Sequence, residues 1–226
     1  AGSAEKVVGE IAALGGTGIP VAVDATEEGS VGEMIQTCLD AFGRIDILVN
    51  NVGGGSGIGP VVKLSAATWD QTIAINLRSA FLCSSAAARA MIPRRSGRII
   101  TISSISGKLG ESLIGPYCAA KFGSIGLMQV MAKELARYGI TVNSVCPGYV
   151  WTPGWERMAE ALRENFSSLA DKTSPQIFDA RVHSMVPLGR PQTPEDVAAV
   201  VAFLASGRAR NITGQAINVD GGAVMG

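Results

Sequence analysis

Two residues whose side chains can cooperate in moving a proton lie in the segment YCAAK, residues 117–121. Tyr117 and Lys121 are four positions apart, and residues at this spacing lie on the same face of a helix. A free tyrosine has a pKa of about 10, which is too high for a base near neutral pH. A cation a few ångströms away favours the phenolate and lowers that pKa. The spacing therefore fits an activated tyrosine, and it fits an ordinary surface pair as well.

The composition indicates a well-packed globular protein and narrows the choice of partners. Hydrophobic residues make up 47% of the 226 residues and charged residues 17%, which argues against disorder. The formal net charge is zero and no basic tract occurs, so nothing favours a nucleic acid or an anionic membrane as partner. No apolar run approaches the roughly 18 residues of a membrane span, and the start, AGSAEKVVGE, shows no signal-peptide pattern. We therefore expect a soluble, cytoplasmic protein.

The cysteines and the histidine offer little for metal binding or nucleophilic catalysis. Cys38, Cys83, Cys118 and Cys146 form no CxxC pair and lie inside apolar runs, which predicts buried free thiols in a reducing compartment. His183 is the only histidine, so a histidine metal site or a Ser–His–Asp triad would depend on it alone. We expect no metal ion.

The segments that must position Tyr117 and Lys121 alternate between strand and helix patterns. Apolar runs predict strands at residues 19–24, 45–50, 97–104, 140–148 and 214–219. Helical periodicity predicts helices at 27–42, shortly after Ser65, at about 70–91, at 116–138 and at 194–206. Strands that are apolar along their length and alternate with helices predict a doubly wound parallel sheet with helices on both faces, a three-layer α/β/α fold.

Several residues mark the ends of these elements. Ser65 and Thr193 can cap the starts of helices, whereas Pro93 and Gly139 can end them. Residues 150–186 are partly helical and amphipathic and contain no clear strand.

Polar residues and a Pro-Gly pair lie at the carboxyl ends of the predicted strands. Ligands of open parallel sheets bind at this edge. The candidates are Asp24, Asn50, Asn51, Ser103, Ser104, Pro147 and Gly148.

Five sequence elements occur in a characteristic order between residues 50 and 222. They are NNVG at 50–53, Asn76 within INLRSAF, Ser104 thirteen positions before the Tyr117-x-x-x-Lys121 motif, PGYVWT at 147–152, and TGQAINVDGG. A YxxxK motif alone is common by chance, but the ordered set resembles the short-chain dehydrogenase/reductase family. The resemblance covers essentially the whole chain and implies one Rossmann-like domain over residues 1–226.

The sequence departs from the family in its first part. The glycine-rich turn TGxxxGxG, which holds the cofactor pyrophosphate at a helix N-terminus, has no counterpart here. The glycine-rich segment 53–59 is no substitute, because Pro60 and Val61 do not open a helix; it is either a loop near the nicotinamide or a flexible surface loop. In the family's strand order the strand at 19–24 pairs with a strand that is missing, which leaves unpaired backbone in the sheet. We therefore expect this chain to lack the first strand–helix–strand unit, and roughly 30 or more residues to precede Ala1.

The resemblance implies hydride transfer between nicotinamide and a secondary alcohol or ketone. Tyr117 would be the general acid/base, and Lys121 would tune Tyr117 and bind the nicotinamide ribose. Ser104 would hydrogen-bond the substrate oxygen and stabilise charge that develops there. Asn76 would hold a water molecule between Lys121 and solvent.

The resemblance also implies a set of cofactor contacts. They are Asp24, Asn50, Gly53, Tyr117, Lys121, Pro147, Gly148, Val150 and Thr152. Two of these residues have alternatives, since Asp24 can cap a turn and Asn50 can fix the backbone at a strand end. The position that normally decides between NAD and NADP is missing. Similarity to diol, acetoin and polyol dehydrogenases favours NAD.

The substrate is expected beneath a lid formed by residues 150–186. The candidate pocket walls are Ser104, Ser106, Glu111, Tyr149 and Trp155, and their mix of aromatic and polar groups favours a small diol, polyol or hydroxyketone. The same motifs also fit a reductase of 3-oxoacyl thioesters or a non-catalytic cofactor-binding sensor. Family members are commonly homotetramers joined by their long helices, and we expect the same here.

Overall fold

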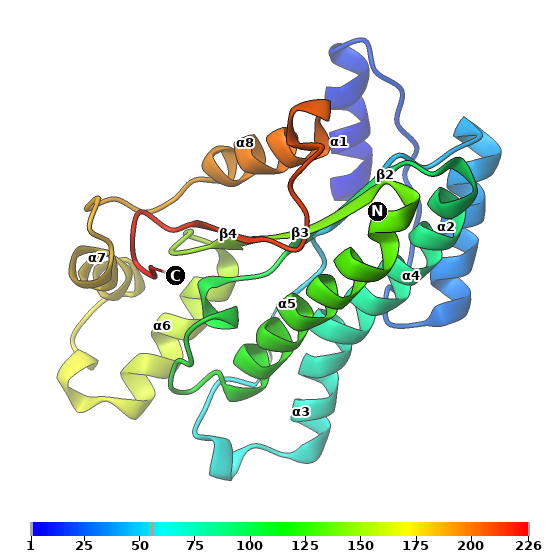
Figure 1. Ribbon diagram of the computed structural model, residues 1–226. Helices are drawn as coiled ribbons and strands as arrows, with labels where there is room; N and C mark the ends of the chain where they lie inside the picture. Colours follow the sequence, from blue (N-terminus) through cyan, green and yellow to red (C-terminus); the bar gives the residue numbers. More distant parts are fainter. Residues whose placement is uncertain (1, 55–56, 226) are drawn as a thin grey trace.

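The protein is a parallel α/β structure in which helices cover both faces of one sheet (Figure 1). The computed structural model describes residues 2–54 and 57–225. The four strands are parallel and lie in chain order. They are β1 (Ile47–Asn50), β2 (Gly97–Ile102), β3 (Ile140–Pro147) and β4 (Ala216–Val219). This arrangement confirms the predicted Rossmann-like fold class.

Eight α-helices surround the sheet among the described residues. They are α1 (Gly2–Ala13), α2 (Glu28–Phe42), α3 (Ala66–Ile73), α4 (Ser79–Met91), α5 (Gly115–Leu135), α6 (Pro153–Asn165), α7 (Ser174–Met185) and α8 (Pro194–Ala205). A π-helical segment, η2 (Ala74–Arg78), joins α3 to α4. Short 3-10 helices cover Val61–Lys63 (η1), Ile92–Arg94 (η3), Ile105–Gly107 (η4), Ala136–Tyr138 (η5), Ser167–Leu169 (η6) and Gly207–Ala209 (η7).

Side chains of the central strands alternate between two cores, because successive residues of a strand point to opposite faces. Ile99 packs with Met91 of α4 and Met128 of α5. The next residue, Ile100, packs on the other face with Leu204 of α8. Ile99, Met91 and Met128 are each at most 1% exposed. The sheet is therefore held between two helix layers, which fixes its carboxyl edge as a rigid base for loops.

The predicted helix boundaries rest on local hydrogen bonds that the structure contains. Ser65 accepts a hydrogen bond from the backbone of Thr68 at the start of α3. Thr193 forms a capping box with Asp196 at the start of α8. Gly139 has a φ of 68°, a left-handed conformation that glycine adopts without strain. These signals are confirmed, and Gly139 ends the 3-10 helix η5, which follows α5, one residue before β3 begins.

Residues 19–24 are the main error of the sequence prediction. They form no strand, because no neighbouring strand among the described residues accepts their backbone hydrogen bonds. β1 forms the edge of the sheet, and the side chains of Ile47 and Val49 are 47% and 40% exposed. The expectation of further residues before Ala1 stays a prediction.

Other parts of the chain differ in detail from their predicted forms. The helix expected at about 70–91 contains the π segment η2, and the final strand is shorter than predicted. Helix α1 had not been predicted, and residues 150–186 contain the two helices α6 and α7. The prediction for the loop 53–59 includes residues 55–56, which lie outside the described residues.

Three of the four cysteines are buried as expected, and Cys38 is an exception. All four cysteines are free, and Cys83, Cys118 and Cys146 are buried, whereas Cys38 is half-buried. His183 is exposed on α7. In residues 2–54 and 57–225, no helix combines the length and the apolar character needed to cross a bilayer.

Candidate active site

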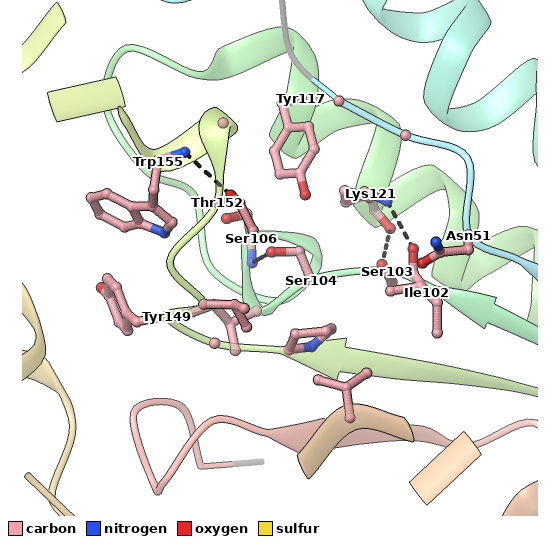
Figure 2. Close-up of a pocket in the computed structure, with 18 of the residues that line it drawn as sticks. Asn51, Ile102, Ser103, Ser104, Ser106, Tyr117, Lys121, Tyr149, Thr152 and Trp155 are labelled. Atoms are coloured by element: carbon pink, nitrogen blue, oxygen red, sulfur yellow. Dashed lines mark hydrogen bonds between the residues drawn. The ribbon is translucent and has the colours of Figure 1, made fainter. Parts of the chain in front are cut away.

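A cavity of about 980 Å³ lies at the carboxyl ends of β1, β2 and β3. The loops that follow these strands line it, and α5 and α6 contribute further walls (Figure 2). This is the edge at which open parallel sheets bind ligands. The topology therefore brings together residues that are more than 100 positions apart, from Asn51 to Trp155.

Tyr117 and Lys121 face this cavity from the first two turns of α5. Pro116 fits the first turn of the helix, where its missing N–H leaves no bond unmade. The Lys121 Nζ lies 5.4 Å from the centre of the Tyr117 ring and donates a hydrogen bond of 2.8 Å to the Ile102 carbonyl oxygen. Figure 2 shows the Tyr117 hydroxyl directed into the cavity, between Ser104 and Lys121. The predicted side-by-side placement is confirmed.

Burial controls the protonation of both side chains. Lys121 is only 4% exposed, and burial lowers its pKa from 10.5 to about 8 because the charged form is poorly solvated. Burial likewise raises the pKa of Tyr117, and the hydrogen bond with Ser104 opposes this shift only in part. The resulting shift of the Tyr117 pKa is upward, opposite to the lowering that the cation of Lys121 was expected to cause.

Ser104 lies two residues beyond the end of β2 and has an extended backbone conformation. Its Oγ accepts a hydrogen bond of 3.1 Å from the backbone of Ser106, which caps the short helix η4. A Cβ on Gly107 would lie 2.9 Å from the Lys121 carbonyl oxygen, so only glycine allows this loop to approach α5 so closely. The contact sets the position of Ser104 relative to Tyr117.

Asn76 lies in the π segment η2 and is 2% exposed. Its Nδ2 donates to the carbonyl oxygens of Thr72 and Gly54, at 2.8 Å and 2.6 Å, and its Oδ1 accepts from the Gly54 N–H at 3.1 Å. The side chain thus fixes the loop after β1. A Cβ on Gly53 would lie 3.0 Å from the Asn76 Oδ1 and 3.3 Å from the Lys121 Nζ. A side chain here would therefore require Asn76 or Lys121 to shift by a few tenths of an ångström. The water-holding role of Asn76 stays a prediction.

Gln192 fixes the loop that follows β3. Its side-chain Oε1 accepts a hydrogen bond of 2.7 Å from the backbone N–H of Tyr149. The backbone N–H of Gln192 donates to the Tyr149 carbonyl oxygen at 2.9 Å. A Cβ on Gly148 would lie 2.8 Å from the Cβ of Asp220, so this position also requires glycine. Thr152 caps α6 by accepting from the Trp155 N–H at 3.4 Å. These bonds hold residues 147–155 as one wall of the cavity.

Two rings of an aromatic cluster, those of Tyr149 and Trp155, line the cavity. The ring centres of Tyr149 and Trp155 are 5.4 Å apart, and those of Trp155 and Phe178 are 5.2 Å apart. The Tyr149 hydroxyl donates to the Oε1 of Glu111 at 3.4 Å. Burial, with a further contribution from the Glu111 charge, raises the pKa of Tyr149 to about 12. The wall therefore combines aromatic rings with one carboxylate.

Most of the predicted site residues meet at this cavity. Those that line it are Gly53, Ser104, Ser106, Glu111, Tyr117, Lys121, Pro147, Gly148, Tyr149, Val150, Thr152 and Trp155. Asp24, Asn50 and Asn76 are not among the lining residues. Asp24 instead caps a turn by accepting from the backbone and hydroxyl of Thr26. Asn50 donates to the side-chain hydroxyls of Ser84 and Thr101 inside the core and, among the described residues, not to the backbone at the strand end.

Some lining residues were missed by the sequence analysis. Arg157 and Met158 reach the cavity from α6, and Val197 and Val201 reach it from α8. No local pattern distinguishes them, because tertiary packing alone decides which side of an amphipathic helix faces a cavity. Asn51 and Ser103, which were candidates because they lie at the ends of predicted strands, do line the cavity.

Comparison with known proteins agrees with this architecture. A family model described as enoyl-(acyl carrier protein) reductase matches residues 1–224. A putative ketoacyl reductase of monensin polyketide synthase from Streptomyces virginiae is 42% identical over 202 residues, which are 88% of this chain and 75% of the relative. A 3-oxoacyl-[acyl-carrier-protein] reductase from Synechocystis is 38% identical over 224 residues, 99% of this chain and 83% of the relative.

A solved structure is similar over nearly the whole chain. It is the sorbitol-6-phosphate 2-dehydrogenase of Erwinia amylovora, with a TM-score of 0.85 and 36% identity, covering 99% of this chain and 85% of that one. The chain belongs to the short-chain dehydrogenase/reductase family. It is an oxidoreductase of a family that uses nicotinamide cofactors.

Proposed function

We propose that this protein catalyses hydride transfer between NAD(P) and a secondary alcohol or ketone, with Tyr117 as the proton donor and acceptor. One observation carries the proposal: Ser104, Tyr117 and Lys121 line the same cavity although they come from two different elements. A sensor that only binds cofactor need not keep Ser104, Tyr117 and Lys121 together.

A bound nicotinamide supplies the hydride in ketone reduction and accepts it in alcohol oxidation. In reduction, the Tyr117 hydroxyl donates its proton to the carbonyl oxygen as the hydride reaches the carbonyl carbon, which yields the alcohol. The Ser104 hydroxyl hydrogen-bonds the same oxygen and stabilises the negative charge that develops there. The raised pKa of Tyr117 suits ketone reduction, because it keeps the phenol protonated until negative charge develops on the substrate oxygen.

The residues around Lys121 fit the nicotinamide end of such a cofactor. Gly53 and Gly148 leave no side chain between the ligand and the backbone, and Lys121 supplies a cation for the ribose hydroxyls. Pro147, Val150 and Thr152 lie along the same wall. Asp24 remains the proposed contact for the adenine end, and Asn50 would act only by fixing the end of β1. NAD is the favoured form.

The proposed substrate is a small diol, polyol or hydroxyketone. The aromatic rings of Tyr149 and Trp155 and the polar groups of Ser106 and Glu111 would surround a short hydroxylated chain. Segment 150–186 would act as the lid. A 3-oxoacyl thioester is the second candidate, and Arg157 favours it, because a guanidinium in the cavity wall suits the phosphate of a carrier arm.

An assay of cofactor oxidation tests the proposal. The protein is mixed with NADH or NADPH and with either a hydroxyketone or an acetoacetyl thioester, and absorbance of the reduced cofactor is followed. Faster turnover of the hydroxyketone supports the first substrate class, and faster turnover of the thioester supports the second. Absence of turnover with every pair would refute the catalytic proposal and favour a sensor.

We also propose a homotetramer joined by α4 and α5. These helices expose Phe81, Phe122 and Val130, each about half accessible, and such side chains gain by burial in an interface. Light scattering that gives the mass of one chain would contradict the tetramer.

A further inference from the structure

One carboxylate lies among mostly apolar groups in the cavity wall. Glu111 is part of the loop between η4 and α5 and lines the cavity together with Ile58, Ile114 and Met158. Its side chain is half-buried. In ligand cavities, a few placed polar groups in an apolar lining set the orientation and identity of the ligand.

Contacts on both sides hold Glu111 in place. The Tyr149 hydroxyl donates to its Oε1 at 3.4 Å, and Tyr149 is itself 2% exposed and packed against Trp155. The Glu111 N–H donates to the Sγ of Cys118 at 3.4 Å. Cys118 adjoins Tyr117 on α5. The carboxylate is therefore held between the aromatic wall and the helix that carries the proton donor.

The charge of Glu111 reaches the reacting centre. After burial, it is one of the smaller causes that raise the pKa of Tyr117, and it also raises the pKa of Tyr149. A ligand whose carbonyl lies at the Tyr117 hydroxyl thus also lies in the field of this carboxylate.

We propose that Glu111, oriented by Tyr149, is a specificity-determining residue that accepts a hydrogen bond from a hydroxyl group of the substrate beside its reacting carbonyl. This inference rests on the proposed function and narrows its substrate class to hydroxylated ketones and polyols.

The chemistry of a carboxylate explains the selection. An ionised carboxylate only accepts hydrogen bonds, and a hydroxyl that donates to it forms a charge-assisted bond. A plain ketone removes water from Glu111 without giving it a donor, which is unfavourable. A carboxylated or phosphorylated group at the same place would be repelled. Sites that hydrogen-bond a substrate hydroxyl discriminate strongly against analogues that lack it.

Matched ketones test the proposal. The values of kcat/KM are measured for butanone and for its derivatives with a hydroxyl one or two carbons from the carbonyl, with NADH and with NADPH. We expect the parent protein to prefer a hydroxylated ketone by about tenfold or more. Glu111→Leu should reduce this ratio at least about tenfold through a higher KM, whereas Glu111→Gln, which retains an acceptor oxygen, should reduce it less. Tyr149→Phe should reduce it modestly, because it removes only the hydroxyl that orients Glu111.

The control is Glu156→Gln, which removes an exposed carboxylate of α6 outside the cavity lining and should leave the ratio unchanged. Because all ketones are measured on one preparation, a poorly folding variant lowers every rate and leaves the ratio intact. A ratio within about twofold of the parent value in Glu111→Leu overturns the proposal. Equal turnover of all ketones by the parent overturns it and leaves the proposed function standing. If no ketone is turned over, both the role of Glu111 and the proposed function are refuted.

Discussion

Replacing Lys121 by methionine should make the free energy of unfolding less dependent on pH. Lys121 has a pKa of about 8 in the folded protein, well below its ordinary value of 10.5. Between these values the unfolded chain binds more protons than the folded one, so stability rises with pH across this interval. Methionine has a similar length and no charge, and it removes this contribution.

The size of the effect follows from the pKa and the burial. Since the side chain is only 4% exposed, solvent screens the charge little. At low pH, keeping Lys121 charged in the folded protein lowers the free energy of unfolding by about 3 kcal/mol. Between pH 7 and pH 9 the side chain loses its proton in the folded protein, and the free energy of unfolding rises by about 1 kcal/mol of this amount. Methionine also leaves the Ile102 carbonyl without its donor, which costs about 1–3 kcal/mol, but this cost is the same at both pH values.

Urea unfolding of the parent and of Lys121→Met at pH 7 and pH 9 measures the difference directly. We expect the parent to gain about 1 kcal/mol relative to the variant over this interval. Other groups that titrate here are common to both proteins and cancel. Lys133→Met, an exposed lysine of the same helix, is the control and should follow the parent. Parallel curves for the parent and Lys121→Met would refute the argument that burial dominates this lysine.

Three further changes test the way the site is positioned. Gly53→Ala places a Cβ 3.0 Å from the Asn76 Oδ1 and should lower kcat/KM about tenfold or more. Gly54→Ala is the control and should change kcat/KM little, because a Cβ at Gly54 meets no atom within 4 Å. Equal effects of the two substitutions would contradict the close approach at Gly53. Thr193→Ala removes the cap of α8 and should lower the free energy of unfolding by about 1 kcal/mol in urea. Trp155→Ala should raise KM for small hydroxyketones, and an unchanged KM would count against its place in the substrate wall.

Capping residues and a helix-ending glycine correctly predicted helix ends, which depend on hydrogen bonds between residues close in the sequence. Gly139, Ser65 and Thr193 mark helix ends because each acts through its own backbone or that of a residue three positions away. Residues 19–24 carry an equally clear strand pattern, yet a strand exists only where a neighbour accepts its hydrogen bonds. A pattern in one segment cannot supply that neighbour.

At the site, too, the sequence predicted what depends on local geometry and missed what depends on tertiary packing. Tyr117 and Lys121 could be placed together from spacing alone, because a helix fixes the relation of residues four apart. The direction in which the Tyr117 pKa shifts could not be predicted from the sequence, because it depends on how deeply the folded chain buries the phenol. Arg157 and Met158 were missed because their helix reaches the cavity through tertiary packing.

The transfer of deuterium from nicotinamide to substrate tests the central claim most directly. The protein is given cofactor deuterated at the transferred position together with a hydroxyketone, and the alcohol formed is analysed by mass spectrometry. The account predicts one deuterium on the carbinol carbon with the parent protein and a rate at least about a thousandfold lower with Tyr117→Phe. Alcohol without deuterium, or an undiminished rate in Tyr117→Phe, would contradict it.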